Sequence, residues 1–172
     1  MMSCEKKLLR AWALFLPGGI RLQGAHEYTP PAINITKVDI KTGAMDAPVS
    51  VDDGMEVLTC SFKIYGYDVA ILTLLGLQAG IYSPEIVVRQ AYQVGGATSG
   101  LVETLQGMIT SITPDARPPT SQAEAAVSVE MSLSYYRQAV DGLETICIIP
   151  EQFVRRINGV NVLSDLKKII RV

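Results

Sequence analysis

Two predicted strands joined by a tight turn near the C-terminus constrain the fold of this chain more than any other feature. From Val127 to Tyr136 apolar residues alternate with mostly polar ones, which is typical of a strand with one buried face. Asp141 and Gly142 readily adopt the positive φ angles of a type I′ turn, and an apolar run over 143–149 follows. The sequence therefore predicts a long β-hairpin. Its outer face of Ser and Glu offers no acid–base chemistry or metal binding, which favours assembly over catalysis.

Length and composition are consistent with one domain that covers residues 1–172. A chain of 172 residues can bury a sizeable core but does not divide comfortably into two domains. Apolar residues make up 48% and charged residues only 19%, against roughly 25% charged in an average soluble domain. A surface with so little charge favours burial in an oligomer, although an ordinary domain with a large apolar core has the same composition.

The charge is distributed unevenly along the chain. Residues 1–43 hold six basic and three acidic groups, residues 44–151 hold four basic and thirteen acidic groups, and residues 152–172 hold five basic groups and one acidic group. Basic ends around an acidic centre favour head-to-tail docking of copies, and the alternative is that these charges only solvate the surface. The net charge of −2 argues against a surface that neutralises phosphates.

The cysteines and the N-terminal segment exclude several other classes. Cys4, Cys60 and Cys147 fit neither a disulfide framework nor a zinc cluster, which indicates reduced thiols and makes Cys60 a small buried hydrophobe. Residues 6–16 superficially resemble a signal peptide, but Arg10 interrupts the apolar stretch, so we expect a mature first strand, with a cleaved signal as the alternative. We expect no stable membrane association, because no apolar run approaches the roughly 20 residues that span a bilayer.

The rest of the chain predicts a mainly β fold, an antiparallel β-sandwich or half-barrel with one flanking α-helix and a short C-terminal helix. The apolar helix expected at 68–77 is covered either by the core and a second subunit or by a loop of its own chain. The predicted elements are strands over 11–16, 20–23, 33–42, 55–64, 84–93 and 101–112, an exposed extended loop over 43–56, a turn over 95–100, a Pro-containing loop over 113–122, and a helix over 164–170 capped by Ser164.

Residues for catalysis, metal binding or cofactor binding do not form a recognisable set. The chain has no Walker-type phosphate loop, and Gly95, Gly96 and Gly100 join two predicted strands and do not open a helix. Its one histidine, His26, falls in a predicted loop. Asp52, Asp53 and Glu56 lack the ordered oxygen spacing of a calcium loop. We therefore expect no catalytic residues, no metal, no cofactor and no enzymatic activity.

Two stretches resemble the major tail tube proteins of contractile-tailed phages. The first is Lys-Thr-Gly-Ala-Met-Asp-Ala-Pro-Val at 41–49, followed by Asp-Asp-Gly-Met-Glu at 52–56, a strand and a Leu-rich helix. The second is Tyr-Tyr-Arg at 135–137 with Asp-Gly at 141–142, then Arg-Ile-Asn-Gly-Val-Asn at 156–161 and a basic helix to Val172. In order and spacing the resemblance covers most of the chain.

The resemblance implies a virion tail tube subunit, assembled in the host cytoplasm. Six copies would form a ring, and the rings would stack into a hollow conduit for DNA inside a contractile sheath, with the sheath, baseplate and tail terminator proteins as partners. It also implies where contacts lie. Contacts between subunits or rings are expected at Gly43, Ala44, Met45, Asp46, Pro48, Asp52, Asp53, Glu56, Leu72, Leu75, Arg155 and Arg156. The acidic middle of the chain suits a conduit, since a negatively charged lumen would repel DNA phosphates, and Glu103 and Glu130 are the candidates for lumen-facing carboxylates because they are polar positions within predicted strands.

Two alternatives stay open at this point. A tube subunit of a bacteriocin or secretion-type injection system shares the fold that the resemblance implies. A small-ligand-binding β-barrel belongs to a different class; it predicts a monomer or small oligomer and leaves the apolar helix and the uneven charge unexplained.

Overall fold

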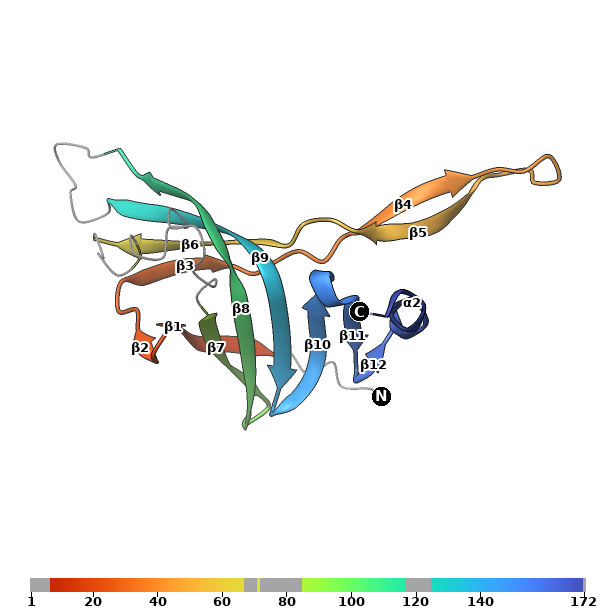
Figure 1. Ribbon diagram of the computed structural model, residues 1–172. Coiled ribbons are helices and arrows are strands. Elements are labelled where there is room, and N and C mark those ends of the chain that lie inside the picture. Colours follow the sequence, from red (N-terminus) through yellow and green to blue (C-terminus); the bar gives the residue numbers. More distant parts are fainter. Residues whose placement is uncertain (1–6, 67–70, 72–84, 117–124, 172) are drawn as a thin grey trace.

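The computed structural model describes residues 7–66, 71, 85–116 and 125–171 (Figure 1). Most residues in this part of the chain are in strands. It also contains a short 3-10 helix, η2 (Pro150–Gln152), and an α-helix, α2 (Ser164–Ile170). The strands are β1 (Leu8–Leu16), β2 (Ile20–Arg21), β3 (Ala25–Thr29), β4 (Ile35–Ile40), β5 (Val49–Met55), β6 (Thr59–Tyr65), β7 (Glu85–Val94), β8 (Ala97–Pro114), β9 (Ala126–Val140), β10 (Leu143–Ile149), β11 (Val154–Ile157) and β12 (Val160–Asn161).

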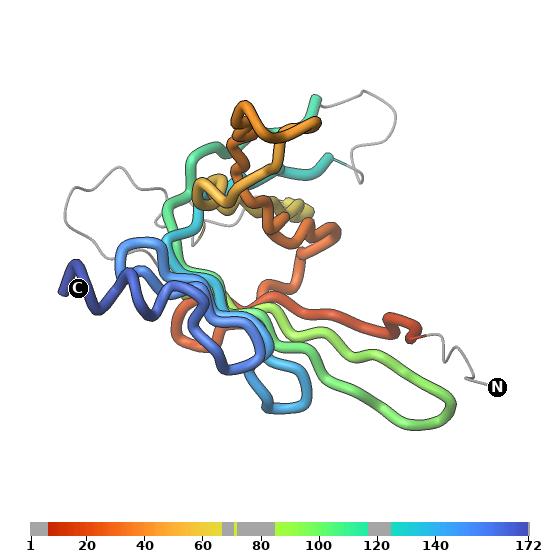
Figure 2. Tube along the Cα trace, turned by 90° about the vertical axis from the view of Figure 1, so that its right-hand side faces the viewer, coloured from red at the N-terminus to blue at the C-terminus, as the bar shows by residue number. Residues whose placement is uncertain are grey.

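Ten of these strands form one antiparallel sheet. The order along it is β12-β11-β10-β9-β8-β7-β1-β2, with β6 also paired to β9 and β3 paired to β6. The sheet does not close into a barrel, and β4 and β5 form a separate two-stranded hairpin that projects from the body (Figures 1 and 2). The predicted fold class, mainly β with an antiparallel half-barrel and a short C-terminal helix, is confirmed.

The long pair β8 and β9 joins the two parts of the sheet. β6 pairs with residues 126–132 of β9, and β10 pairs with residues 136–140 of the same strand. β8 pairs with β9 along its other edge, opposite both β6 and β10. The register between β8 and β9 shifts between Gln106 and Gly107, which is a β-bulge. A Cβ at Gly107 would lie 2.0 Å from the backbone oxygen of Ser132, so only glycine allows this close approach. Both strands bend along their length (Figure 1).

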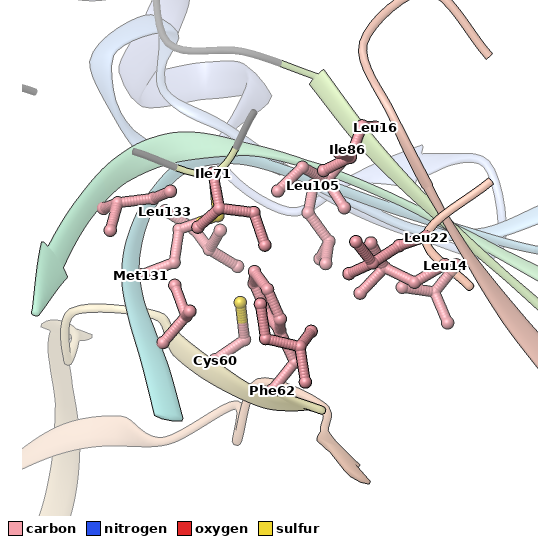
Figure 3. Close-up of a cluster of buried hydrophobic side chains, with 14 of the residues drawn as sticks. Leu14, Leu16, Leu22, Cys60, Phe62, Ile71, Ile86, Leu105, Met131 and Leu133 are labelled. Atoms are coloured by element: carbon pink, nitrogen blue, oxygen red, sulfur yellow. The ribbon is translucent and has the colours of Figure 1, made fainter. Parts of the chain in front are cut away.

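The core fills the inner face of the bent sheet (Figure 3). Cys60, Phe62 and Ile64 of β6 are buried, as their alternation predicts, and Val129 and Met131 face them from β9. Leu14 of β1 and its neighbours on β7 and β8 complete the cluster, whose other members include Ile86, Val88, Leu105, Ile109 and Leu133. Ile71, the one described residue of the helix expected at 68–77, is 2% exposed and belongs to this core; the rest of that helix lies outside the described residues.

The C-terminal hairpin predicted from the sequence is confirmed as β9 and β10. Asp141 and Gly142 have φ angles of 49° and 84°, so both central residues are in the left-handed region as a type I′ turn requires. The Asp141 carboxylate accepts hydrogen bonds from the Gly100 amide at 2.7 Å and from the Ser99 hydroxyl at 2.8 Å. These bonds hold the pKa of Asp141 below its usual value and attach the turn to β8.

Several predicted boundaries are wrong, for reasons visible in the pairing. Residues 49–55 of the expected loop form β5, because their backbone pairs with β4 outside the main core. The turn expected over 95–100 is only Gly95-Gly96, and β8 continues to Pro114. His26 lies in β3, whose polar sequence gave no strand signal. Ser164 opens α2 without capping it, since Leu163 is the N-cap. Residues 117–122 of the expected loop lie outside the described residues.

The bulge at Gly107 generates a stability prediction. Gly107→Ala places a methyl group against the backbone of Ser132 and Leu133 and is expected to lower the free energy of unfolding by about 2 kcal/mol or more. The matched control is Gly100→Ala in the same strand, where the nearest atom is 3.9 Å away and no loss is expected. Urea denaturation of both variants checks this, and equal stability would show that the close approach is not a constraint.

Candidate assembly site

The projecting hairpin of β4 and β5, with its tip over 41–48, is here called the arm. On one face the cross-strand pairs Val38–Val51 and Ile40–Val49 form an apolar stripe in which each side chain is 45–51% exposed. On the other face the Ser50 hydroxyl donates a hydrogen bond to Asp39, which also pairs with Lys37. An isolated two-stranded hairpin is marginally stable in water, so an arm with a bare apolar face is suited to packing against another surface.

A groove of about 790 Å³ lies at the base of the arm, and we call it the basal groove. Its walls come from the end of β5 and the residues after it, from β9, from the segment that runs from β10 through η2 to β11, from the residues between β12 and α2, and from α2 itself. Most of the lining side chains are apolar, among them Met55, Val57, Leu58, Leu133, Ile148, Phe153, Val154, Val162, Leu163 and Leu166. Asp52, Asp53, Glu56, Glu151 and Arg155 are its charged residues.

Arg155 is the one buried cation that lines the basal groove. Its side chain is 8% exposed, and its Nη2 donates to Oδ2 of Asp52 at 2.8 Å. Its Nε and Nη1 are buried and have no hydrogen-bond partner among the described residues. Asp52 also accepts a hydrogen bond from the Gly54 amide at 2.8 Å. This hydrogen bond is the main cause that lowers the pKa of the Asp52 carboxyl, and the hydrogen bond from Arg155 is the second. The structure thus joins two predicted contact residues within one subunit, across 103 positions of sequence.

The other expected contact residues lie in three places. Gly43, Ala44, Asp46 and Pro48 are exposed at the arm tip and Met45 is half-buried there. Asp53 is exposed, and Glu56 accepts a hydrogen bond from Asn34 at 3.1 Å. The Glu144 carboxylate binds both Arg156 at 2.8 Å and Arg137 at 3.0 Å. Leu72 and Leu75 lie outside the described residues. Their role as contacts between subunits stays a prediction.

The two carboxylates expected to face a lumen have opposite environments. Glu130 is exposed on β9, whereas Glu103 is 1% exposed and faces the core. The alternation of β8 places Glu103 on the same face as the buried Leu105, so the prediction that it faces a lumen is wrong. A polar residue within a predicted strand suggests an outward-facing side chain, whereas Glu103 is buried and has hydrogen-bond partners inside the subunit.

Hydrogen bonds compensate for the burial of Glu103. The Tyr136 hydroxyl donates to Oε1 at 2.7 Å and the Gln90 amide donates to Oε2 at 2.7 Å, while Tyr92 holds Gln90 at 2.8 Å. The pKa of Tyr136 is raised mainly by its burial, and in addition by its hydrogen bond to Glu103. Burial and the nearby Glu103 charge also raise the pKa of the Cys60 thiol to about 12, which keeps Cys60 a neutral core residue as its pattern predicts.

The described residues contain neither a candidate metal centre nor a candidate membrane-spanning helix. No three or more His, Cys, Asp or Glu side chains gather there in a way that could hold a metal ion. No helix in the same part of the chain has the length and apolar character needed to cross a membrane.

Comparison with known families decides what this arrangement belongs to. The family model of the phage tail tube protein FII matches residues 6–170. The chain belongs to this family. It is therefore a tail tube subunit, a structural component of the phage tail, and the resemblance found in the sequence is confirmed.

The fold also resembles that of a solved structure. The chain is similar to one in the cryo-EM structure of an extracellular contractile injection system, the PVC sheath–tube complex in its extended state. The TM-score is 0.60 with 7% sequence identity, and the match covers 74% of this chain and 87% of that chain. At this identity the likeness concerns the fold. No curated protein matches the chain.

The Glu103 cluster generates a second stability prediction. Tyr136→Phe removes one of the two hydrogen bonds to a buried carboxyl group and is expected to lower the free energy of unfolding by about 1–3 kcal/mol. Tyr135→Phe is the control, because no hydrogen bond of its hydroxyl is found in the described chain. Thermal or urea unfolding measures both, and a neutral Tyr136→Phe would show that the bond does not support the core.

Proposed function

We propose that this tail tube subunit assembles into hexameric rings that stack into a hollow tube, through which DNA passes during ejection inside a contractile sheath. The single observation that carries the self-assembly is the arm, a projecting hairpin with an apolar stripe that its own subunit leaves uncovered. Family membership supports the tube, and the stripe explains why a lone subunit is incomplete.

Unpaired strand edges also support a ring, because they are further surfaces that a single subunit leaves without a partner. β7 ends its pairing with β8 at Gln106, so the segment of β8 over 107–114 has a strand neighbour only on the β9 side within the described residues. The outer edges of β3 and of β1 over 8–13 are likewise unpaired in the part of the chain that the structure describes. Exposed edges promote uncontrolled pairing, and pairing between neighbours in a closed ring removes them.

The remaining partners of the proposed tube follow from its place in a tail. The sheath would surround it, the baseplate and tail terminator proteins would bind its ends, and assembly would take place in the host cytoplasm. A bacteriocin or secretion-type injection tube is the alternative of the same kind. The ligand-binding barrel has less support, because the sheet is open and the basal groove lies at the base of the arm.

Glu130 is the remaining candidate for a lumen carboxylate. It is exposed on β9 close to Glu27, Lys63 and Ser128. Because Glu27 and Lys63 form an ion pair at 3.3 Å, the unpaired charge of this patch is negative. A negative wall would repel DNA phosphates and let the duplex slide without adhering.

The apolar stripe of the arm generates an assembly prediction. The double variant Val38→Ser with Val51→Ser makes the stripe polar while leaving the core intact, so we expect folded subunits that no longer form rings or tubes. The control is Asp39→Ser, on the opposite face of the arm. Negative-stain electron microscopy across a concentration range, with circular dichroism for folding, gives the readout. Discrete monomers from the unmodified protein would overturn the proposed function itself.

A second prediction concerns the lumen charge. Glu130→Lys is expected to leave tubes intact but slow DNA ejection, because a positive wall binds phosphates. Glu130→Gln, which removes charge without reversing it, should have a smaller effect. Ejection rates of particles that carry each variant are measured by fluorescence of released DNA. Unchanged rates at both variants would place Glu130 outside the lumen.

A further inference from the structure

The outward face of β3, β6, β9 and the end of β8 is mainly polar. In β6 buried and outward side chains alternate, so Lys63 points away from the core, and the same alternation turns Glu130 of β9 outward. The four strand segments lie side by side (Figure 1). Most of their other outward positions carry small hydroxyl side chains, namely Thr29, Thr59, Ser61, Thr110, Ser128 and Ser132. We call this surface the hydroxyl face.

Lys63 is the strongest anion-binding group of the hydroxyl face. It is the one lysine or arginine in β3, in β6, in residues 107–114 of β8 and in residues 126–132 of β9. Its Nζ lies 3.3 Å from Oε2 of Glu27, the residue opposite it on β3. Both residues line a pocket of about 170 Å³ that also contains Glu130. The charges of Lys63 and Glu27 cancel, and Glu130 leaves the pocket with a net negative charge.

Stability does not account for this ion pair. The side chains of Lys63 and Glu27 are 41% and 55% exposed, and ion pairs so open to water add little to the free energy of unfolding. The pairing of β3 with β6 is also held on its core side, where Tyr28 lies opposite the buried Phe62. The main effect of Glu27 on this face is therefore electrostatic, because it gives the lysine a partner within the same subunit.

The free edges of these strands indicate where the hydroxyl face would lie in a tube. The outer edge of β3 and that of β8 over 107–114 have no neighbouring strand among the described residues. A ring closed through these edges would place the four strands in its wall, with the subunit's own core against one side. The hydroxyl face is the other side of that wall, and its net negative charge suits the side that DNA passes.

We propose that Glu27 is the internal counter-ion of Lys63 and prevents the hydroxyl face from binding the phosphates of duplex DNA in the lumen. The inference rests on the proposed function, because it concerns DNA that moves through a tube. Neutral hydroxyl groups form weaker hydrogen bonds to phosphate than an ammonium group does. A paired Lys63 therefore leaves the described part of this wall without a free cation. Glu27 thus determines whether the duplex slides along the wall or adheres to it.

Removal of the counter-ion tests this assignment. Glu27→Gln keeps the size of the side chain but leaves Lys63 unpaired, and we expect DNA ejection, followed by fluorescence of the released DNA, to slow by about twofold or more at low salt. Raised salt should reduce the difference, since it screens the binding of lysine to phosphate. Glu27→Gln combined with Lys63→Gln should restore the unmodified rate, because no cation remains to be shielded. An unchanged rate with Glu27→Gln, or a double variant that stays as slow, would overturn the proposal.

A matched control removes the same charge elsewhere. Asp165 pairs with Lys168 at 3.4 Å on α2, so Asp165→Asn also frees one lysine per subunit, outside the hydroxyl face. Ejection should then proceed at the unmodified rate. Equal slowing by Asp165→Asn and Glu27→Gln would mean that the total charge of the particle sets the rate, and this would overturn the role of Glu27. Electron microscopy of the tails shows whether each variant assembles.

Cysteine labelling separates this inference from the proposed function. All variants carry Cys4→Ser, since Cys60 and Cys147 are buried. Thr29→Cys places a thiol at an exposed position of the hydroxyl face. In assembled tubes we expect it to react with a small maleimide but not with a maleimide on a polymer too large to enter the lumen. If unmodified subunits never form tubes, the proposed function fails first.

Two labelling results would overturn the inference while the tube itself stands. Tubes in which the cysteine at position 29 reacts with both reagents would have the hydroxyl face on their outside. Tubes in which it reacts with neither reagent, although free subunits react with both, would have this face covered by a contact between subunits. In either case the pair of Glu27 and Lys63 would not meet DNA.

Discussion

The close approach of β8 and β9 at Gly107 is the constraint on which the fold depends. One continuous strand pair serves both parts of the sheet, because the bulge lets β9 exchange its neighbour from β6 to β10 along its length. The core fills the concave side of this bend, from Phe62 on β6 to Leu14 on β1. A straight ladder would leave the inner face of the sheet open to water. The missing side chain at Gly107 thus permits one of the two register shifts of this ladder, within the strand pair that carries the core on its inner face.

Strand alternation and turn chemistry predicted those parts of the fold that follow local rules. The buried face of β6 and the hairpin around Asp141 were evident, because period-two burial and an Asp-Gly turn are properties of neighbouring residues. β3 and β5 were missed for one shared reason. Both strands are polar or exposed, so their composition does not indicate a strand. They are strands because they pair with β6 and β4, respectively.

The candidate site, too, could be predicted from the sequence only where neighbouring residues form a pattern. Sequence resemblance singled out Asp52 and Arg155 separately, but no pattern connects positions that far apart, and their ion pair appears only once the chain is folded. Glu103 shows the reverse error. A polar position within a predicted strand suggested an outward-facing side chain, whereas Tyr136 and Gln90 supply the donors that let Glu103 lie inside. When the hydrogen-bond partners of a buried polar group lie far away in the sequence, the residues next to it do not reveal them.

The Asp52–Arg155 ion pair has a geometric consequence. Asp52 belongs to β5, at the base of the arm, and Arg155 belongs to β11, so the pair connects the base of the arm to the body of the subunit. In any polymer built from identical head-to-tail contacts, the same angle recurs at every step and errors accumulate along its length. A bond of 2.8 Å within one subunit would therefore set an angle that every copy carries into the proposed tube, and the straightness of that tube would depend on how rigidly each arm is held.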